Sequence, residues 1–189
     1  IVAFYDLISD EDKNKILKEL AESTVEDAQM IKGEAKNTDR NNCTFYVPLL
    51  LDLKMESSSL LESAGDKFIF NIGKVIGQQS QLYQEKQRKQ PVECDYNRSY
   101  MRKIVINIPD GYKMENLDQL ILFKEIKNAK GEVTCKFKSE YKIEGTKVIV
   151  SIEEFYSQLH YPLSEFEQYR SVVNAAADFN KVAVLLQKK

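Results

Sequence analysis

The residues of this sequence best equipped for chemistry are three cysteines and one histidine. Cys43, Cys94 and Cys135 are widely spaced along the chain, and His160 is its single imidazole. A cysteine nucleophile needs a base within reach and a setting that lowers the thiol pKa, such as a helix N-terminus. None of the three cysteines has that setting, and Cys135 falls in mid-strand on an apolar face. We therefore predict that Cys135 is a core residue, that His160 is a surface or turn residue, and that the chain has no catalytic residue.

Patterns for metal, phosphate or nucleic-acid chemistry are incomplete. The cysteines form no CxxC pair of the zinc-binding type, and Asp39, Asn41 and Asn42 lack the central glycine and bidentate glutamate of a calcium loop. Residues 73–77, GKVIG, lack the Lys and Ser or Thr that follow the second glycine of a phosphate loop. The short basic patch at residues 86–89, KQRK, is typical of a solvated face. We predict no metal ion and no cofactor.

Composition limits the class of protein. The chain has 189 residues, enough for one large domain or two small ones. Its 27 basic and 29 acidic residues leave a net charge of -2, so no overall field attracts nucleic acid or an anionic membrane. No apolar run reaches the roughly 18 residues of a membrane-spanning helix. Tyrosine and phenylalanine, at 10 and 9, each outnumber the 7 glycines, which suits the faces of a β-sheet.

The start of the chain and the cysteine count leave two questions open. The sequence begins at Ile1, without Met or a signal-peptide pattern, in the middle of an apolar run. This favours a fragment of a longer protein over a mature chain whose signal was removed. The odd number of cysteines allows one disulfide with a free thiol, or three free thiols. Because cysteine is among the most buried residue types, free and partly buried thiols are favoured.

The first half predicts one helix followed by strands. Ser9 is a suitable N-cap, and three acids follow it, so a helix is expected to about residue 22. Strands are expected at residues 24–36, 44–55 and 67–72, with the 56–66 loop between the last two. Gly33 indicates a bulge or edge in the first of them, and Pro48 an edge or bulge in the second.

Residues 73–91 are rich in glutamine and are read either as a surface loop or as a short helix at 79–89. Because long loops inside compact domains are uncommon, any internal boundary is expected here. We predict one β-rich domain over residues 1–189, with two β subdomains, 1–88 and 89–189, as the alternative.

The second half predicts an antiparallel meander and a closing helix. Alternation and turn residues place strands at 96–108, 120–127, 133–143 and 147–155. Ser164 and Glu167 have the spacing of a capping box, and Phe166, Tyr169 and Val173 then trace one helical face. A short apolar strand, with Val182, Val184 and Leu186 on one face, ends the chain. The predicted fold is mostly β (α+β minor): an antiparallel β-sandwich-like domain with an N-terminal and a C-terminal helix packed on the sheet.

Two segments carry a family resemblance. They are KQPVECDYNRSYMRKIVINIPDGYKMENL at residues 89–117 and YPLSEFEQYRSVVNAAADFNKVAVLLQKK at residues 161–189. Together they resemble the C-terminal domain of unknown function of bacterial exported transglutaminase-like proteins. The resemblance covers residues 88–189 well and the first half loosely, and its motifs are structural: a strand, a Pro-Gly turn and a capped helix.

The resemblance implies a non-catalytic role. In that family an N-terminal β-rich domain and a papain-like transglutaminase core precede this module, members are exported by Gram-negative bacteria, and many are regarded as peptidases. The core's catalytic Cys, His and Asp match no position here. We therefore expect an accessory domain, periplasmic or at the cell surface, that stabilises or positions the core or binds a peptide or cell-wall ligand. The alternative is an independent β-sandwich module that binds carbohydrate or peptide, although the absence of Trp weakens sugar stacking. A small cysteine-dependent enzyme is the least favoured hypothesis.

Overall fold

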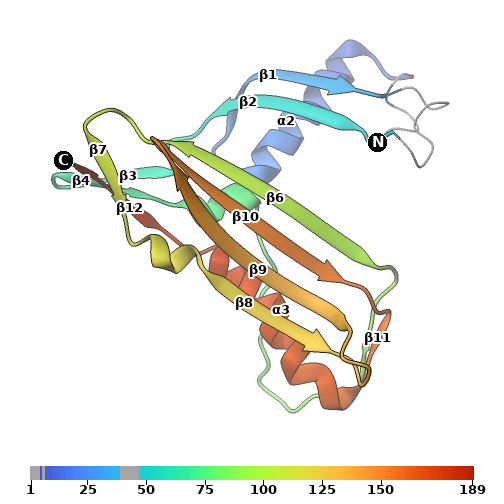
Figure 1. The fold of residues 1–189 in the computed structure, drawn as a ribbon. Coiled ribbons are helices and arrows are strands. Elements are labelled where there is room, and N and C mark those ends of the chain that lie inside the picture. Colours follow the sequence, from blue (N-terminus) through green and yellow to red (C-terminus); the bar gives the residue numbers. More distant parts are fainter. Residues whose placement is uncertain (1–4, 6, 39–46) are drawn as a thin grey trace. The chain divides into compact units, whose positions relative to one another are not determined.

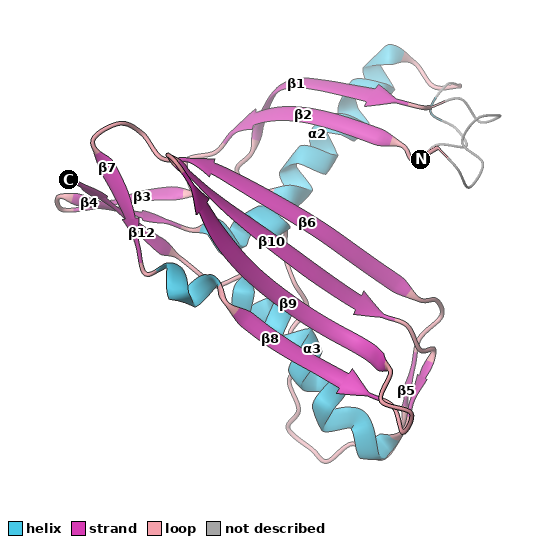
Figure 2. Cartoon of the chain, in the orientation of Figure 1, coloured by secondary structure: helices cyan, strands magenta, loops and turns pink. Residues whose placement is uncertain are grey.

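The computed structural model describes residues 5, 7–38 and 47–189. The chain divides into two compact units, Ile1–Ser59 and Leu60–Lys189, and strands predominate in the second (Figure 1, Figure 2). The sequence-based boundary at residue 88 falls inside the second unit. Among the described helices, none has both the length and the apolar character needed to cross a membrane. The expected class, mostly antiparallel β with an N-terminal helix, a sheet-packed C-terminal helix and a short final strand, is confirmed.

The first unit consists of a helix packed on a hairpin. It contains α2 (Asp10–Thr24), β1 (Gln29–Lys36) and β2 (Leu50–Glu56). Ser9 caps the helix as predicted, since its hydroxyl accepts a hydrogen bond from the amide of Asp12 at 3.1 Å. Leu17 and Ala21 are buried on the helix. The helix continues past the expected end at 22, so the predicted strand at 24–36 begins only at Gln29.

One prediction about the hairpin is confirmed and one needs correction. Because β1 and β2 form a two-stranded sheet, Gly33 lies in an edge strand, as predicted, and the bulge lies beside it between Met30 and Lys32. A Cβ atom at Gly33 would come within about 3 Å of the Leu17 side chain, so the glycine allows α2 to approach β1 closely. The expected strand at 44–55 is shorter, because β2 begins after Pro48, whose nitrogen cannot donate to a ladder. Residues 44–46 lie outside the described residues.

A serine clasp, formed by Asp27 and Ser57, Ser58 and Ser59, closes the first unit. The Asp27 carboxylate accepts hydrogen bonds from all three hydroxyls at 2.6–2.8 Å. It also accepts from the amides of Ser58 and Ser59, at 2.8 and 2.9 Å. These bonds favour the charged form, above all those from the serine hydroxyls, and hold the pKa of Asp27 well below its usual value. The clasp thus ties the connection between α2 and β1 to the residues that follow β2.

The second unit contains two four-stranded antiparallel sheets (Figure 1). The larger has the order β6-β10-β9-β8 and corresponds to the predicted meander. Its strands are β6 (Arg98–Asn107), β8 (Leu122–Lys127), β9 (Val133–Glu144) and β10 (Lys147–Tyr156). The turns before β9 and β10 contain Gly131 and Gly145 in the left-handed region, at φ of 80° and 59°.

The smaller sheet brings distant parts of the chain together. Its order is β3-β4-β12-β7, so the C-terminal strand lies between two strands from earlier in the chain. Its strands are β3 (Leu61–Ala64), β4 (Lys67–Phe70), β7 (Tyr112–Glu115) and β12 (Val184–Lys188). The expected loop at 56–66 is therefore partly wrong: β3 lies within it. Gly65, with φ of 68°, turns β3 into β4.

Short elements complete this unit. β5 (Val92–Glu93) pairs with β11 (His160–Tyr161). The unit also contains three 3₁₀ turns: η1 (Ile72–Ile76), η2 (Leu117–Leu120) and η3 (Leu163–Glu165). The glutamine-rich residues 77–91, which follow η1, form a loop and not a helix. Asn174 anchors this loop by accepting from the Leu82 amide at 2.7 Å and donating to the Leu82 carbonyl at 3.2 Å.

The C-terminal helix α3 (Phe166–Phe179) packs on one face of the larger sheet, over β8 and β9 (Figure 1). Its predicted apolar face is confirmed, since Phe166, Tyr169 and Val173 are buried. The predicted capping box is wrong. Pro162 begins η3, and no side chain caps α3, so Ser164 precedes the helix as part of a 3₁₀ turn.

Phe166→Ala tests the docking of α3. Removing a buried aromatic ring should lower the free energy of unfolding by about 3–5 kcal/mol. Ser164→Ala is the matched control in the adjoining turn, and because Ser164 caps nothing it should change that energy by less than about 0.5 kcal/mol. Denaturant melts of both variants measure the difference. Equal losses in the two variants would contradict the docked-helix geometry.

Asp27→Asn tests the serine clasp. The folded pKa of Asp27 is lowered, so its stabilisation is present above about pH 3.9, the pKa of an unfolded aspartate. That stabilisation is lost as the pH falls toward the lower folded pKa. We expect Asp27→Asn to speed hydrogen exchange of the Ser58 and Ser59 amides at neutral pH, measured by NMR. Asp52→Asn, at an exposed carboxylate of the same hairpin, should leave that exchange unchanged, and unchanged exchange in Asp27→Asn would refute the clasp.

Candidate functional site

The two described cysteines are free thiols in different settings. Cys135 is 0% exposed in the core of the second unit, as predicted. Burial, with the nearby Glu154 charge, raises the pKa of Cys135 to about 12, so this thiol is not ionised at neutral pH. Cys94 is half-buried, with its Sγ 3.9 Å from the hydroxyl of Tyr169. Cys43 lies outside the described residues.

His160 lies on the surface, as predicted. Its Nδ1 is 2.7 Å from Glu93 Oε1, across the short β5–β11 ladder, and both side chains are more than half exposed. Among the residues that the structure describes, no cluster of three or more His, Cys, Asp or Glu side chains could hold a metal ion. The calcium-like residues Asp39, Asn41 and Asn42 lie outside that part of the chain.

Charged side chains instead gather on the inner face of the larger sheet, near one end of β6. Arg98 is paired in register with Tyr156 of β10, and Tyr100 with Glu154. Arg102 comes two residues further along β6 and shares this face. Together they line a cavity of about 340 Å³, here called the arginine pocket. Its full lining is Gln78, Gln79, Ser80, Arg98, Tyr100, Arg102, Glu154, Tyr156, Val173 and Ala176.

A buried ion pair forms one wall of the arginine pocket. Glu154 is only 4% exposed, and its Oε2 accepts from Arg102 Nη1 at 2.8 Å. Its Oε1 accepts from the hydroxyl of Tyr156 at 3.0 Å. Burial, followed by the Glu154 charge, raises the pKa of Tyr156, so this hydroxyl remains a donor. Both oxygens of the carboxylate therefore have partners, which a buried charge requires.

Arg98 forms the other wall and has a different kind of partner. Its guanidinium lies over the Tyr156 ring, 4.4 Å from the centroid, and Nη2 donates to the hydroxyl of Tyr169 at 3.3 Å. Within the described part of the chain, no carboxylate forms an ion pair with Arg98. Burial opposes its charge, but the nearby tyrosines and Cys94 leave the pKa of Arg98 raised, so the guanidinium stays charged. The pocket lining thus holds two guanidinium groups and one carboxylate, a net charge of +1.

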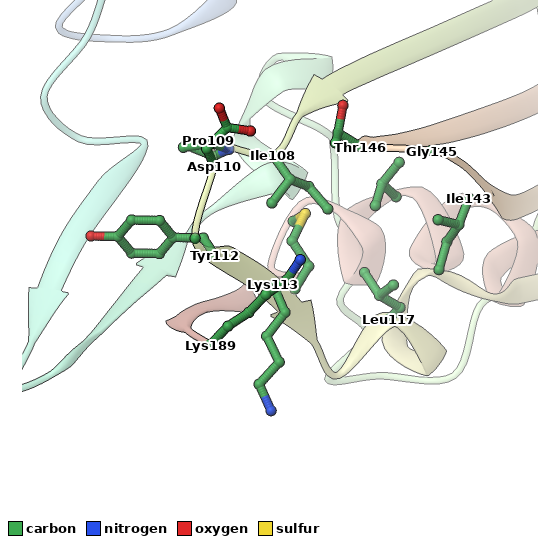
Figure 3. Close-up of a pocket in the computed structure, with 13 residues that line it drawn as sticks. Ile108, Pro109, Asp110, Tyr112, Lys113, Leu117, Ile143, Gly145, Thr146 and Lys189 are labelled. Atoms are coloured by element: carbon green, nitrogen blue, oxygen red, sulfur yellow. The ribbon is translucent and has the colours of Figure 1, made fainter.

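A second cavity, of about 220 Å³, lies under the IPDGY turn (Figure 3). Ile108, Leu117 and Ile143 give it apolar walls, and the ring of Tyr112 points away from it (Figure 3). The amide of Lys189 donates to the Gly111 carbonyl at 2.8 Å, which ties the chain end to this turn. The cavity holds no buried ion pair, and its residues connect the two sheets. It is a weaker candidate for ligand recognition than the arginine pocket.

Comparison with known protein families identifies the family to which the second unit is similar. The family of domains of unknown function called DUF3858 matches residues 66–186, most of the chain. The chain belongs to this family. The match confirms the expected domain of unknown function and covers every residue of the arginine pocket. No curated protein and no solved structure matches the chain.

Sequence reasoning missed the arginine pocket, although a signal was present. Arg98 and Arg102 are at even-numbered positions of β6, like Ile104 and Ile106, whose side chains pack against the core. Charged residues at strand positions that face the core indicate either an oppositely charged partner or a cavity. Glu154 carries the same signal on β10, where the buried positions Ile152, Glu154 and Tyr156 alternate with less deeply buried ones. Pairing these residues required the strand order, which the sequence does not state.

Glu154→Gln tests the buried ion pair. It leaves the half-buried Arg102 guanidinium without a carboxylate, which should cost about 3 kcal/mol of unfolding free energy. The double variant Arg102→Met/Glu154→Leu removes both charges and should lie within about 1 kcal/mol of the parent chain. Glu144→Gln, which breaks the exposed pair between Lys142 and Glu144, serves as control and should not change stability measurably. Denaturant melts of the three variants measure these energies, and a fully stable Glu154→Gln would contradict the assignment.

Proposed function

We propose that this chain is a non-catalytic accessory domain that acts by binding. The single observation that carries the proposal is the arginine pocket, whose groups suit recognition better than reaction. Two guanidinium groups supply positive charge, and they and the tyrosine hydroxyls can form hydrogen bonds. Both oxygens of the one carboxylate already accept hydrogen bonds. None of these groups is a nucleophile with an adjacent base.

The positions of the two described thiols and of the imidazole support the non-catalytic part of the proposal. The buried Cys135 thiol has a raised pKa, the opposite of what a cysteine nucleophile needs. Cys94 contacts a tyrosine hydroxyl, and His160 is directed to Glu93. A base steered toward a thiol would be the minimum for a cysteine hydrolase.

The resemblance of residues 88–189 extends the proposal to the parent polypeptide. We place the domain after a transglutaminase-like core of the same polypeptide, which it stabilises or positions. Such a parent would be exported, to the periplasm or the cell surface, and would itself be the peptidase-like component. This placement rests on the resemblance of the IPDGY and C-terminal helix segments and predicts a core that precedes residue 1.

The alternative is an independent module that binds carbohydrate or peptide. One observation favours its peptide form: β6 is an edge strand of its sheet, and the arginine pocket opens on the same strand. An edge strand presents unpaired backbone groups to which an extended peptide can add.

Activity and gene context test the proposed function. Residues 1–189, incubated with peptide and glutamine-donor substrates, should give no turnover above the blank. Turnover that Cys43→Ala, Cys94→Ala or Cys135→Ala abolishes would overturn the non-catalytic assignment. The coding sequence upstream of residue 1 should encode a Cys, His and Asp core, whereas an unrelated domain or a stop codon there would favour the independent module. If the core is present, residues 1–189 added to the separately expressed core should raise its melting temperature.

A further inference from the structure

The arginine pocket has a charge that its own residues do not balance. The Glu154 carboxylate accepts hydrogen bonds from Arg102 and Tyr156, so it neutralises one of the two guanidinium groups. Arg98 is left with an aromatic face and a neutral hydroxyl. A positive charge that is partly withdrawn from water, in a cavity without its own counter-ion, attracts an anion more strongly than an exposed one does.

The donors of the pocket have the geometry of a carboxylate site. A guanidinium carries five N–H donors in a planar fork, and the hydrogen bonds described for Arg98 use one of its nitrogens, Nη2. The contact with the Tyr156 ring and the hydrogen bond to Tyr169 restrict the position of that fork before any ligand arrives. Planar two-point recognition of this kind suits the two oxygens of a carboxylate.

The remaining lining defines the size and polarity of the ligand. About 340 Å³ is at the small end of ligand pockets, which span roughly 300–1,000 Å³. Gln78 and Ser80 contribute an amide and a hydroxyl, and Tyr100, which is 42% exposed, offers an aromatic surface. These groups suit a ligand with amide or hydroxyl groups beside its acidic end.

The charge of the pocket selects among anions. A carboxylate, with one negative charge, balances the net charge of +1. A phosphate ester dianion would leave an excess negative charge close to the buried Glu154 carboxylate, and like charges at that range repel. The pocket should therefore prefer a carboxylate to a phosphate of similar size.

We propose that the arginine pocket binds the carboxylate of a small organic acid, with Arg98 as the primary contact and Arg102 as the second. The inference rests on the proposed binding function and names the chemical class of its ligand. A peptide C-terminus and a free small acid both supply this chemistry, and the experiment separates them.

The test is an NMR titration of residues 1–189 with N-acetyl-alanyl-alanine, its C-terminal amide, acetate and inorganic phosphate. The free acid should shift the resonances of Gln78, Gln79 and Ser80 and the side-chain resonances of Arg98. Because a charge-assisted hydrogen bond is lost, the amide should bind at least about tenfold more weakly. Phosphate should also bind more weakly than the acid.

Variants assign the effect to the pocket. Arg98→Gln should weaken binding of the acid at least about tenfold, and Arg98→Lys should recover part of the loss because it restores the charge. Arg88→Gln is the matched control, since Arg88 also lies over an aromatic ring, that of Phe166, but outside the pocket. It should leave binding unchanged. Dispersed spectra of each variant verify that it folds.

Each outcome has a separate meaning. Acetate binding as tightly as the peptide supports the carboxylate and makes a free acid the source, whereas much weaker acetate binding supports the peptide. Equal binding of acid and amide, tighter binding of phosphate, or an unaffected Arg98→Gln variant would overturn the carboxylate inference and leave the proposed binding function standing. If none of the titrants shifts any resonance, the inference is overturned as well. New product resonances during the titration would instead overturn the non-catalytic function.

Discussion

The packing of α3 against the inner face of the larger sheet is the constraint on which the second unit depends. Ala175, Ala176 and Ala177 give the helix a small-residue surface, and all three are buried. At its C-terminal end, a Cβ atom on Gly73 would collide with the carbonyl of Phe179, so a residue other than glycine would push η1 away from the helix. From that point the chain turns into β12, one of the two inner strands of the smaller sheet. One helix therefore fixes both sheets, and a single core includes residues from each.

The same packing explains why a cavity exists at the edge of the larger sheet. α3 lies over β8 and β9, so the inner faces of β10 and β6 are covered less completely toward the β6 edge. Residues 77–91 cover that region as a loop, held to α3 by Asn174 and Asn180. Along β10 the inner positions change from apolar to charged, from Val150 and Ile152 to Glu154. The arginine pocket forms where the sheet is covered by the 77–91 loop and no longer by α3. Charged side chains can lie there because they keep partial access to water.

Local patterns in the sequence predicted the elements that local physics determines. Alternation and glycine turns were sufficient for β6, β9 and β10, and helical spacing for the face of α3 that carries Phe166. The strands β3 and β7 were missed because they are short and their partners, β4 and β12, include a strand from the far end of the chain. The capping box failed because Pro162 starts a 3₁₀ turn that takes the place of a cap. The arginine pocket could not be predicted, since it joins Arg102 to a carboxylate 52 residues away.

The pocket also connects two parts of the unit that otherwise share few polar contacts. Its lining comes from the strands β6 and β10 and from Gln78, Gln79 and Ser80 of the loop. The side-chain hydrogen bonds described for that loop run to α3, to Asn180 and Lys181 just after it, to η1 or within the loop itself. An anion held by Arg98 and the loop would therefore add a link between the sheet edge and the loop. By mass action, a ligand that binds only this folded arrangement stabilises it by about 2.7 kcal/mol at a hundred times its Kd. If the pocket binds the acid as proposed, occupancy and loop order would be coupled, and a partner that contacts this loop would respond to the bound acid without touching it.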